Sequence, residues 1–235
     1  MRLCVLLPAF NEESTIRGLI KEIRLFVKDV IVVDDGSLDS TAKLANEEKV
    51  YVISHKKRSG KGAALRSGFE YVLNNNFDAV ITMDSDFQHD PSELSKFIRC
   101  AETSSSDIII GNRMAEKKGM PLMRRLTNKI MSLILSVLIK QRIPDTQCGF
   151  RLIRKNVLQN IALTSMNFEI ESEILLRAAQ KKFKIESMPI KAIYLGRKSH
   201  ISPFLDTLRF MRFLTKMTIE TSYPGFFNRK IRHER

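Results

Sequence analysis

Two aspartates one residue apart are the residues in this sequence best placed to do chemistry. Residues 79–91 read AVITMDSDFQHDP, an apolar run that ends at Asp84 and Asp86. Such a run predicts a buried strand, and open α/β sheets bind ligands at the carboxyl ends of their strands. Residues i and i+2 face the same way, so both carboxylates can meet one cation, and Gln88 adds a neutral oxygen. The pattern predicts a divalent metal, Mg²⁺ or Mn²⁺, at Asp84, Asp86 and Gln88, unless the pair is only a solvated turn.

Three more polar motifs follow apolar runs. They are PAFNEE at residues 8–13, VDDGSLD at 33–39 and SGKGAA at 59–64. Asp34 and Asp35 precede Gly-Ser, which is also ordinary turn chemistry, so a purely structural role for Asp34 stays open. Lys61 suggests a P-loop, but residue 55 is His where that motif needs Gly, and Gly62 stands in place of Ser or Thr. We therefore exclude an ATPase and expect Lys61 to contact a phosphate.

Apolar runs alternate with helical patterns along most of the chain. Strands alternating with helices of 10–15 residues indicate βαβ units, so we predict an α/β fold with a mostly parallel sheet flanked by helices. The expected strands cover residues 3–9, 29–35, 50–55, 79–83, 107–111 and 185–195, and the expected helices cover residues 14–26, 40–48, 61–74, 92–101, 120–140 and 169–182.

The length of 235 residues fits one domain, predicted at residues 1–202, with a basic amphipathic tail at 203–235. The three cysteines show no metal or disulfide spacing, which favours a reducing compartment. The apolar start is broken by Pro8 and Asn11, so we interpret it as a strand and not as a signal peptide. The longest apolar run, residues 130–139, is too short to span a bilayer.

The formal net charge of +13 is unevenly distributed. Residues 111–142 hold 8 Lys or Arg against 1 acid, and residues 181–235 hold 13 against 4. Basic charge beside amphipathic stretches suggests an anionic surface, either a membrane or a nucleic acid. The helix expected at 120–140 is either an ordinary core helix or a membrane-edge helix. We expect its apolar face to oppose a basic one, with Leu122, Leu126, Ile130, Leu133, Ile134 and Val137 on the first and Arg124, Arg125 and Lys129 on the second.

Together, the four motifs in this order resemble the family 2 glycosyltransferases of the GT-A fold. Two further segments, Gly111-Asn112-Arg113 and Asp145 to Arg151 (DTQCGFR), resemble signatures of the polyprenyl-phosphate sugar transferases, the dolichyl-phosphate mannose and glucose synthases. The second segment and residues 168–171 (FEIE) favour the glucosyl branch. The resemblance covers nearly the whole chain and implies a metal-dependent, inverting hexosyltransferase that uses UDP-glucose or GDP-mannose.

The resemblance also assigns residues to a nucleotide-sugar donor. Asp35 offers a carboxylate to ribose or base, Phe10 offers a stacking face, and Ser85 approaches the ribose through its backbone. Asp86 is expected to be catalytic through the metal. The donor residues expected in full are Pro8, Phe10, Glu12, Val33, Asp35, Lys61, Asp84, Ser85, Asp86, Gln88 and Arg197.

Arginines carry the expected acceptor site. The positions of Arg113, Arg124 and Asn128 match those at which the family binds the phosphate of the lipid, and a guanidinium fork suits phosphate oxygens. Both arginines are also predicted to be catalytic, although a solvated basic face is the simpler alternative, and Arg125 could replace Arg124. A phosphate acceptor is already anionic, so it needs alignment and charge neutralisation more than a strong base. Asp145, Glu169 and Glu171 are expected to hold sugar hydroxyls or to order the acceptor loop.

The sequence departs from the mannosyl pattern at two places. In the mannosyl branch a basic residue follows Ser near the last strand, whereas this chain has Ser199-His200. Glu169 stands where that branch often carries Lys. Arg197 and Lys198 could supply the missing positive charge to the diphosphate. We expect a peripheral enzyme at the cytoplasmic face of a membrane, with a possible anchoring partner subunit. A transferase with a soluble or polysaccharide acceptor stays an alternative. A nucleic-acid-binding module is disfavoured because no reading motif accompanies the basic residues.

Overall fold

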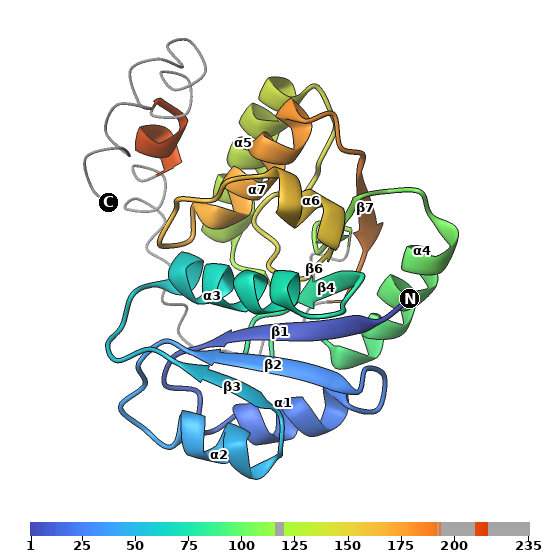
Figure 1. Cartoon of the computed structure of the whole chain (residues 1–235). Coiled ribbons are helices and arrows are strands. Elements are labelled where there is room, and N and C mark those ends of the chain that lie inside the picture. The colour runs from blue at the N-terminus through green and yellow to red at the C-terminus, as the bar shows by residue number, and fades with distance from the viewer. Residues whose placement is uncertain (116–119, 192, 194–209, 216–235) are drawn as a thin grey trace, which may run out of the picture. The chain divides into compact units, whose positions relative to one another are not determined.

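The structure is a computed structural model that describes residues 1–115, 120–191, 193 and 210–215 (Figure 1). Contacts divide the chain into two compact units, residues 1–197 and 198–235. All strands and numbered helices belong to the first unit, and residues 210–215 are helical in the second. The boundary expected after residue 202, and most of the expected basic tail, lie outside the described residues.

A seven-stranded sheet in the order β3-β2-β1-β4-β6-β5-β7 forms the centre of the first unit. Four of its pairings are parallel, and β6 runs antiparallel to both β4 and β5. The sheet is therefore mostly parallel, as predicted. Its strands are β1 (Leu3–Ala9), β2 (Asp29–Asp34), β3 (Tyr51–Ser54), β4 (Ala79–Thr82), β5 (Ile108–Asn112), β6 (Arg151–Arg154) and β7 (Ile185–Pro189).

Helices cover both faces of the sheet (Figure 1). Helix α3 packs on β1, β2 and β4, while α1 and α2 pack together on the opposite face of the same strands. Helix α5 packs against α7. The helices are α1 (Ile16–Ile23), α2 (Thr41–Glu47), α3 (Lys61–Asn74), the 3₁₀ turn η1 (Pro91–Glu93), α4 (Leu94–Thr103), α5 (Leu122–Ile139), α6 (Lys155–Asn160) and α7 (Ile170–Gln180).

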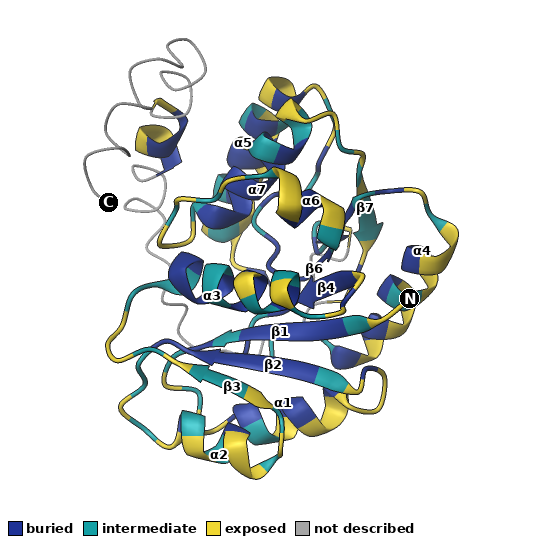
Figure 2. Ribbon diagram, viewed as in Figure 1, coloured by how far each residue is buried: buried dark blue, intermediate teal, exposed yellow. Residues whose placement is uncertain are grey.

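The core is continuous from the central strands into the helices that cover them (Figure 2). Residues 4–7 of β1 and residues 79–81 of β4 are buried completely, as the apolar runs predict for strands covered on both faces. Aspartates accept backbone hydrogen bonds at the starts of α2 and of the 3₁₀ turn η1. Asp39 accepts a hydrogen bond from the backbone N–H of Thr41 at 2.9 Å, and Asp90 accepts one from that of Ser92 at 2.9 Å.

Strand β6 and helix α6 have no counterpart among the expected elements. Strand β6 has only Leu152 and Ile153 as apolar residues between two arginines, so no hydrophobic pattern indicated it. The strand expected at 185–195 ends at Pro189, and its last part includes residues outside the described ranges. In the described part of the chain, no helix is both long and apolar enough to cross a membrane.

Candidate active site

The first and last of the four motifs meet where β1 and β4 end. These strands are parallel neighbours, with Leu6 of β1 opposite Thr82 of β4. The segment after β4 stays beside β1, because the Ser85 hydroxyl donates a hydrogen bond to the Pro8 carbonyl oxygen at 2.8 Å. Strand β2 adds the second motif from the other side, with Asp34 opposite Ala9. The expected convergence of polar residues at the carboxyl edge is therefore present.

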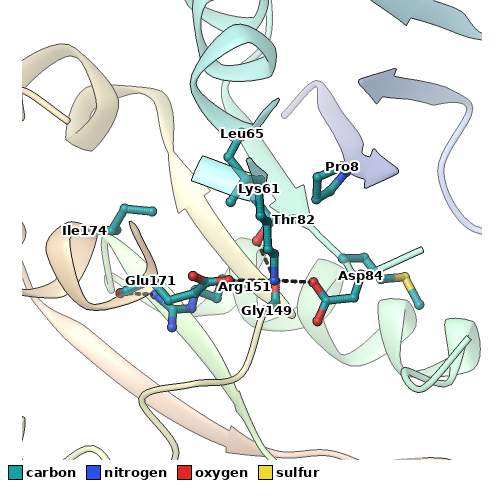
Figure 3. A pocket seen from close by; sticks show the side chains of 10 residues that line it. Pro8, Lys61, Leu65, Thr82, Asp84, Gly149, Arg151, Glu171 and Ile174 are labelled. Carbon is teal, nitrogen blue, oxygen red and sulfur yellow. Dashed lines mark hydrogen bonds and ion pairs between the residues drawn. The ribbon is translucent and has the colours of Figure 1, made fainter. Parts of the chain in front are cut away.

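Lys61 lies between two carboxylates in a pocket at this edge (Figure 3). Its Nζ atom is 2.5 Å from Asp84 Oδ1 and 2.6 Å from Glu171 Oε1. The three side chains come from the start of α3, the end of β4 and the start of α7, and they line one pocket together with Thr82, Gly149 and Arg151. Glu171 was expected to hold sugar or to order a loop, and its pairing with Lys61 was not foreseen.

Burial and ion pairing determine the charges in this cluster. Burial lowers the pKa of Lys61, but the attraction of Asp84 and Glu171 outweighs it and raises that pKa above its ordinary value. Burial raises the pKa of Asp84, but the Lys61 ammonium and His89 together hold it well below 3.8. Lys61 and Asp84 are therefore both charged at neutral pH. The second oxygen of Glu171, Oε2, is buried without a hydrogen-bond partner in the described structure.

Gly149 allows the Asp84 carboxylate to sit where it does. A Cβ atom at residue 149 would be 2.6 Å from Asp84 Oδ1, which is far below van der Waals contact. Gly62 likewise allows a close approach, because a Cβ atom there would be 2.5 Å from the Ser165 carbonyl oxygen. Only glycine allows the backbone to approach this closely at both positions.

Asp86 and Gln88 form the outer part of the edge. Asp86 Oδ1 accepts a hydrogen bond from the backbone N–H of Gln88 at 3.0 Å. The side-chain oxygen of Gln88 accepts one from Arg124 Nη1 at 3.2 Å. Residues expected on the donor side and on the acceptor side are thus within hydrogen-bonding distance of each other. Arg124 is half-buried, unlike Arg125 beside it, which is exposed.

These residues fit a divalent cation by the type of their donor atoms. Asp84, Asp86 and Gln88 supply oxygens, which Mg²⁺ and Mn²⁺ prefer. Asp84 already meets a cation, the Lys61 ammonium, and its other oxygen, Oδ2, is 3.3 Å from His89 Nε2. Across the described residues, no group of three or more Asp, Glu, His or Cys side chains is placed to hold an ion. A cation at this edge would therefore need further oxygens, such as those of a bound diphosphate.

Asp35 fixes the loop that leads into α3. Its carboxylate accepts hydrogen bonds from the backbone N–H groups of Ser59 at 2.9 Å and Gly60 at 2.7 Å, and its Oδ1 is 2.7 Å from His55 Nδ1. The side chain is 5% exposed, so these partners take up most of the carboxylate. Asp35 therefore positions the residue before Lys61, and direct contact with ribose or base stays a prediction.

The other expected donor residues surround the same edge in different ways. The Arg58 guanidinium lies over the ring of Phe10, 4.3 Å from its centroid, so the expected stacking face already has a cationic neighbour. Glu12 starts α1 through its carbonyl oxygen, which accepts from the Thr15 and Ile16 N–H groups. Val33 is buried within β2. Arg197, with Lys198, lies outside the described residues.

Arg113 and Asn128 meet at Asp145. Arg113 donates from Nε at 2.8 Å and from Nη2 at 2.9 Å, and Asn128 donates to Asp145 Oδ1 at 2.7 Å. Burial raises the pKa of Asp145, but the Arg113 charge and these hydrogen bonds hold it below 3.8. The three residues are buried, so in this structure Arg113 and Asn128 serve Asp145, and binding of an acceptor phosphate by them stays a prediction.

Two buried charged residues to which the sequence analysis gave no role hold the backbone around the cluster. The Arg151 guanidinium donates to the carbonyl oxygens of Cys148 at 2.7 Å, Thr146 at 2.6 Å and Glu171 at 2.6 Å. The Glu173 carboxylate accepts from the backbone N–H groups of Thr164 and Ser165 and so holds the loop that packs on Gly62. The position of Arg151 at the end of the DTQCGFR segment was the available signal for it.

Comparisons with known proteins agree with this geometry. Residues 4–162 match glycosyl transferase family 2, so the chain belongs to that family and is a glycosyltransferase. It is 30% identical over 213 residues to the UDP-N-acetylglucosamine–dolichyl-phosphate N-acetylglucosaminyltransferase of Methanococcus voltae, with 81% of this chain and 85% of the relative covered. It is 28% identical over 203 residues to the polyprenol monophosphomannose synthase of Mycolicibacterium smegmatis, with 80% and 76% covered.

A solved structure shows the same fold. Glucosyl-3-phosphoglycerate synthase from Mycobacterium tuberculosis, in complex with Mn²⁺ and UDP-glucose, superposes with a TM-score of 0.70 at 20% identity, covering 93% of this chain and 78% of that one. The predicted GT-A fold is thereby confirmed. The resemblance to the polyprenyl-phosphate sugar transferase group is also confirmed by the names of the two sequence relatives.

Proposed function

We propose that this glycosyltransferase moves a hexose from a nucleotide-diphosphate sugar, UDP-glucose or GDP-mannose, to the phosphate of a polyprenol or dolichol. The hydrogen bond between Gln88 and Arg124 is the observation that carries this proposal. It joins the edge suited to a donor diphosphate to a guanidinium suited to an acceptor phosphate. Two anionic reactants can therefore meet beside one cationic side chain.

On the donor side, Asp84, Asp86 and Gln88 would hold a divalent cation, Mg²⁺ or Mn²⁺, against the diphosphate. The cation would supply positive charge to the departing nucleotide diphosphate. Asp35 fixes the loop that carries Lys61, and Lys61 fixes Asp84 and Glu171, so the positions of these carboxylates are set before the donor arrives. The unpartnered Oε2 of Glu171 is available to accept a hydrogen bond from the donor.

On the acceptor side, Arg124 would align the phosphate for attack on the anomeric carbon. A phosphate oxygen is anionic near neutral pH, so the attack needs orientation more than a base. The direct displacement inverts the configuration at that carbon, and the nucleotide diphosphate leaves. The Arg113–Asp145–Asn128 network anchors α5 behind Arg124 and so keeps the guanidinium in place. We place the enzyme at the cytoplasmic face of the membrane, where nucleotide sugars are found.

A transfer assay tests the proposal. Radiolabelled UDP-glucose, GDP-mannose and UDP-N-acetylglucosamine are offered in turn to a polyprenyl phosphate with Mn²⁺ or Mg²⁺, and organic-phase label is counted with and without chelator. We expect chelator-sensitive label from one donor. Donor binding without lipid labelling would contradict the lipid acceptor and favour a soluble or polysaccharide acceptor instead.

Replacement of Arg124 tests the observation behind the proposal. Hydrogen bonds to charged groups contribute about 1.5–3 kcal/mol, so Arg124→Ala should raise the KM for polyprenyl phosphate by roughly 10- to 100-fold. The KM for the nucleotide sugar should change little. Arg142→Ala, an exposed arginine beyond the end of α5, is the matched control. Equal acceptor KM values for both variants would contradict a role for Arg124 in acceptor binding.

A further inference from the structure

The side chains expected to bind the divalent cation already have partners in the described structure. Asp84 Oδ1 is 2.5 Å from the Lys61 ammonium. Asp86 accepts a hydrogen bond from the backbone N–H of Gln88, and the side-chain oxygen of Gln88 accepts one from Arg124. A divalent cation that arrives without the donor therefore has to compete with two cationic side chains of the protein itself.

The competition is sharpest at Asp84, because its carboxylate is closely surrounded. Lys61 faces Oδ1, and His89 Nε2 is 3.3 Å from Oδ2. The backbone of Gly149 also lies close, since a Cβ atom there would be 2.6 Å from Oδ1 and 2.7 Å from Oδ2. A metal ion bound to Asp84 and the Lys61 ammonium would be neighbours on one carboxylate. Like charges this close repel each other strongly in a partly buried site.

Lys61 is able to leave Asp84 without a change in the backbone. It is the first residue of α3, and Asp35 holds the residue before it through the Gly60 N–H group. A lysine carries its compact charge on a flexible stem of four carbons, so rotation about these bonds moves the ammonium. Figure 3 shows the stem reaching across the pocket to the two carboxylates. An anion placed beside Asp84 is therefore within reach of the same charge.

Glu171 gives a second, independent sign that this pocket takes a ligand. Its Oε1 atom is 2.6 Å from Lys61 Nζ, whereas Oε2 is buried and has no hydrogen-bond partner in the described structure. The side chain is only 7% exposed and lines the same pocket as Asp84. A buried acceptor without a donor is unfavourable. The pocket is therefore suited to a ligand that donates a hydrogen bond, such as a hydroxyl of the donor or a water molecule on a cation.

We propose that Lys61 takes the place of the metal ion at Asp84 until the nucleotide sugar binds, and that the diphosphate then draws the ammonium away. The diphosphate attracts both cations and so ends their competition for one carboxylate. Metal and nucleotide would consequently bind together, each raising the affinity of the protein for the other by the same factor. This inference rests on the proposed function, because it uses the donor and the metal ion named there, and it assigns Lys61 the coupling between them.

Binding of Mn²⁺ to the full chain in the absence of nucleotide tests the competition. Electron paramagnetic resonance measures the free Mn²⁺ that remains at each total concentration. We expect Lys61→Met to bind Mn²⁺ at least about ten-fold more tightly than the parent, because its Asp84 and Glu171 carboxylates have lost their cation. Asp84→Asn in the Lys61→Met background should abolish the gain. Lys21→Met, which removes a lysine that is 64% exposed, is the matched control and should bind as the parent does.

Thermal unfolding with Mn²⁺ alone gives a readout that is independent of sugar transfer. In Lys61→Met the metal ion should replace the missing ammonium between Asp84 and Glu171. Mn²⁺ should therefore raise the melting temperature of this variant by more than that of the parent, since a ligand that binds the folded state stabilises it. Lys61→Gln also removes the charge, but its amide can still donate a hydrogen bond to one carboxylate. It provides the same test if Lys61→Met does not fold.

Addition of UDP or GDP tests the coupling, after correction for the complex that each nucleotide forms with Mn²⁺ in protein-free solution. In the parent, the nucleotide that binds should raise the affinity for Mn²⁺ at least about ten-fold, and the increase should be smaller in Lys61→Met. Equally tight binding of Mn²⁺ by the parent with and without nucleotide would overturn the inference. So would equally weak binding of Mn²⁺ alone by the parent and the Lys61 variants.

Two other outcomes separate this inference from the proposed function. Absence of Mn²⁺ binding by the parent with either nucleotide would overturn the inference together with the metal site of the proposed function. Absence of sugar transfer to any polyprenyl phosphate, with the Mn²⁺ results as expected, would overturn the proposed acceptor and leave the role of Lys61 supported.

Discussion

Lys61 has a different role in the structure from the one that its sequence context suggests. In the sequence it follows glycine in a loop and suggests a phosphate contact. In the structure it lies between the Asp84 and Glu171 carboxylates and fixes both. The sequence predicted that both Asp84 and Lys61 lie near the donor phosphates, but not that they pair with each other. It could not predict Glu171, which comes from a helix far along the chain.

Removal of the Lys61 charge should destabilise the protein. Lys61→Met leaves two carboxylates facing each other without a cation. Breaking a buried ion pair costs about 3–5 kcal/mol, and we expect the lower end because the Asp84 side chain is 27% exposed. Thermal unfolding measures the loss. Lys21→Met removes the ion pair that a 64% exposed lysine makes with Glu48, which still pairs with Arg17, and should cost at most about 1 kcal/mol. Equal losses for the two variants would contradict the role of Lys61.

Asp145 should make the free energy of unfolding depend on pH in the acid range. Its pKa in the folded protein is held below 3.8, so the pair with Arg113 stabilises the fold fully above that value and loses its effect as pH falls through the lower, folded-state pKa. Asp145→Asn leaves the Arg113 charge buried and should cost about 3–5 kcal/mol at pH 7.

Melting curves of the parent and Asp145→Asn at several pH values check this dependence. The gap between the two proteins should be wide at pH 7 and should narrow below about pH 4. Asp29→Asn, which removes an exposed pair with Arg2, should show a small gap at every pH. A gap for Asp145→Asn that does not change with pH would contradict the ionised pair.

Strand β6 is the element that sequence patterns could not reveal. Four residues with charged ends give no clear period, and the Arg151 side chain is accommodated in the interior by three carbonyl oxygens. Helix α5 is the converse case. Its apolar period predicts the helix correctly, but a period cannot tell which face meets the core, and here the buried face is the one with Asn128 and Ser132.

Arg151 should therefore be essential to this part of the fold. Arg151→Met keeps the length of the side chain but removes a donor from three buried carbonyl groups. Each unsatisfied group costs about 1–3 kcal/mol, so we expect a loss of several kcal/mol in denaturant unfolding. Arg99→Met, at an exposed position of α4, is the control and should be nearly neutral. Similar midpoints for both variants would show that Arg151 does not support β6.

At the scale of the whole molecule, the strand order makes one site from motifs that are distant in sequence. Strands β1, β2 and β4 are neighbours, so residues after each strand reach the same edge. The βαβ rhythm of the sequence predicts the fold class and a mostly parallel sheet, whereas the family was recognised from the resemblance of the motifs. The pairing of Arg113 with Asp145, and of Arg124 with Gln88, joins residues from different elements that are distant in sequence, which no local pattern encodes.

The most direct test of the central claim is sugar transfer by two variants that each lose one carboxylate of the sheet. With Mn²⁺, the accepted donor and a polyprenyl phosphate, the initial rate of lipid labelling is compared for the parent, Asp86→Asn and Asp29→Asn. Asp29 is at the opposite, amino-terminal end of β2. We predict a fall of at least about 100-fold for Asp86→Asn and less than about two-fold for Asp29→Asn. A folded Asp86→Asn variant that labels the lipid at the parent rate would contradict the account.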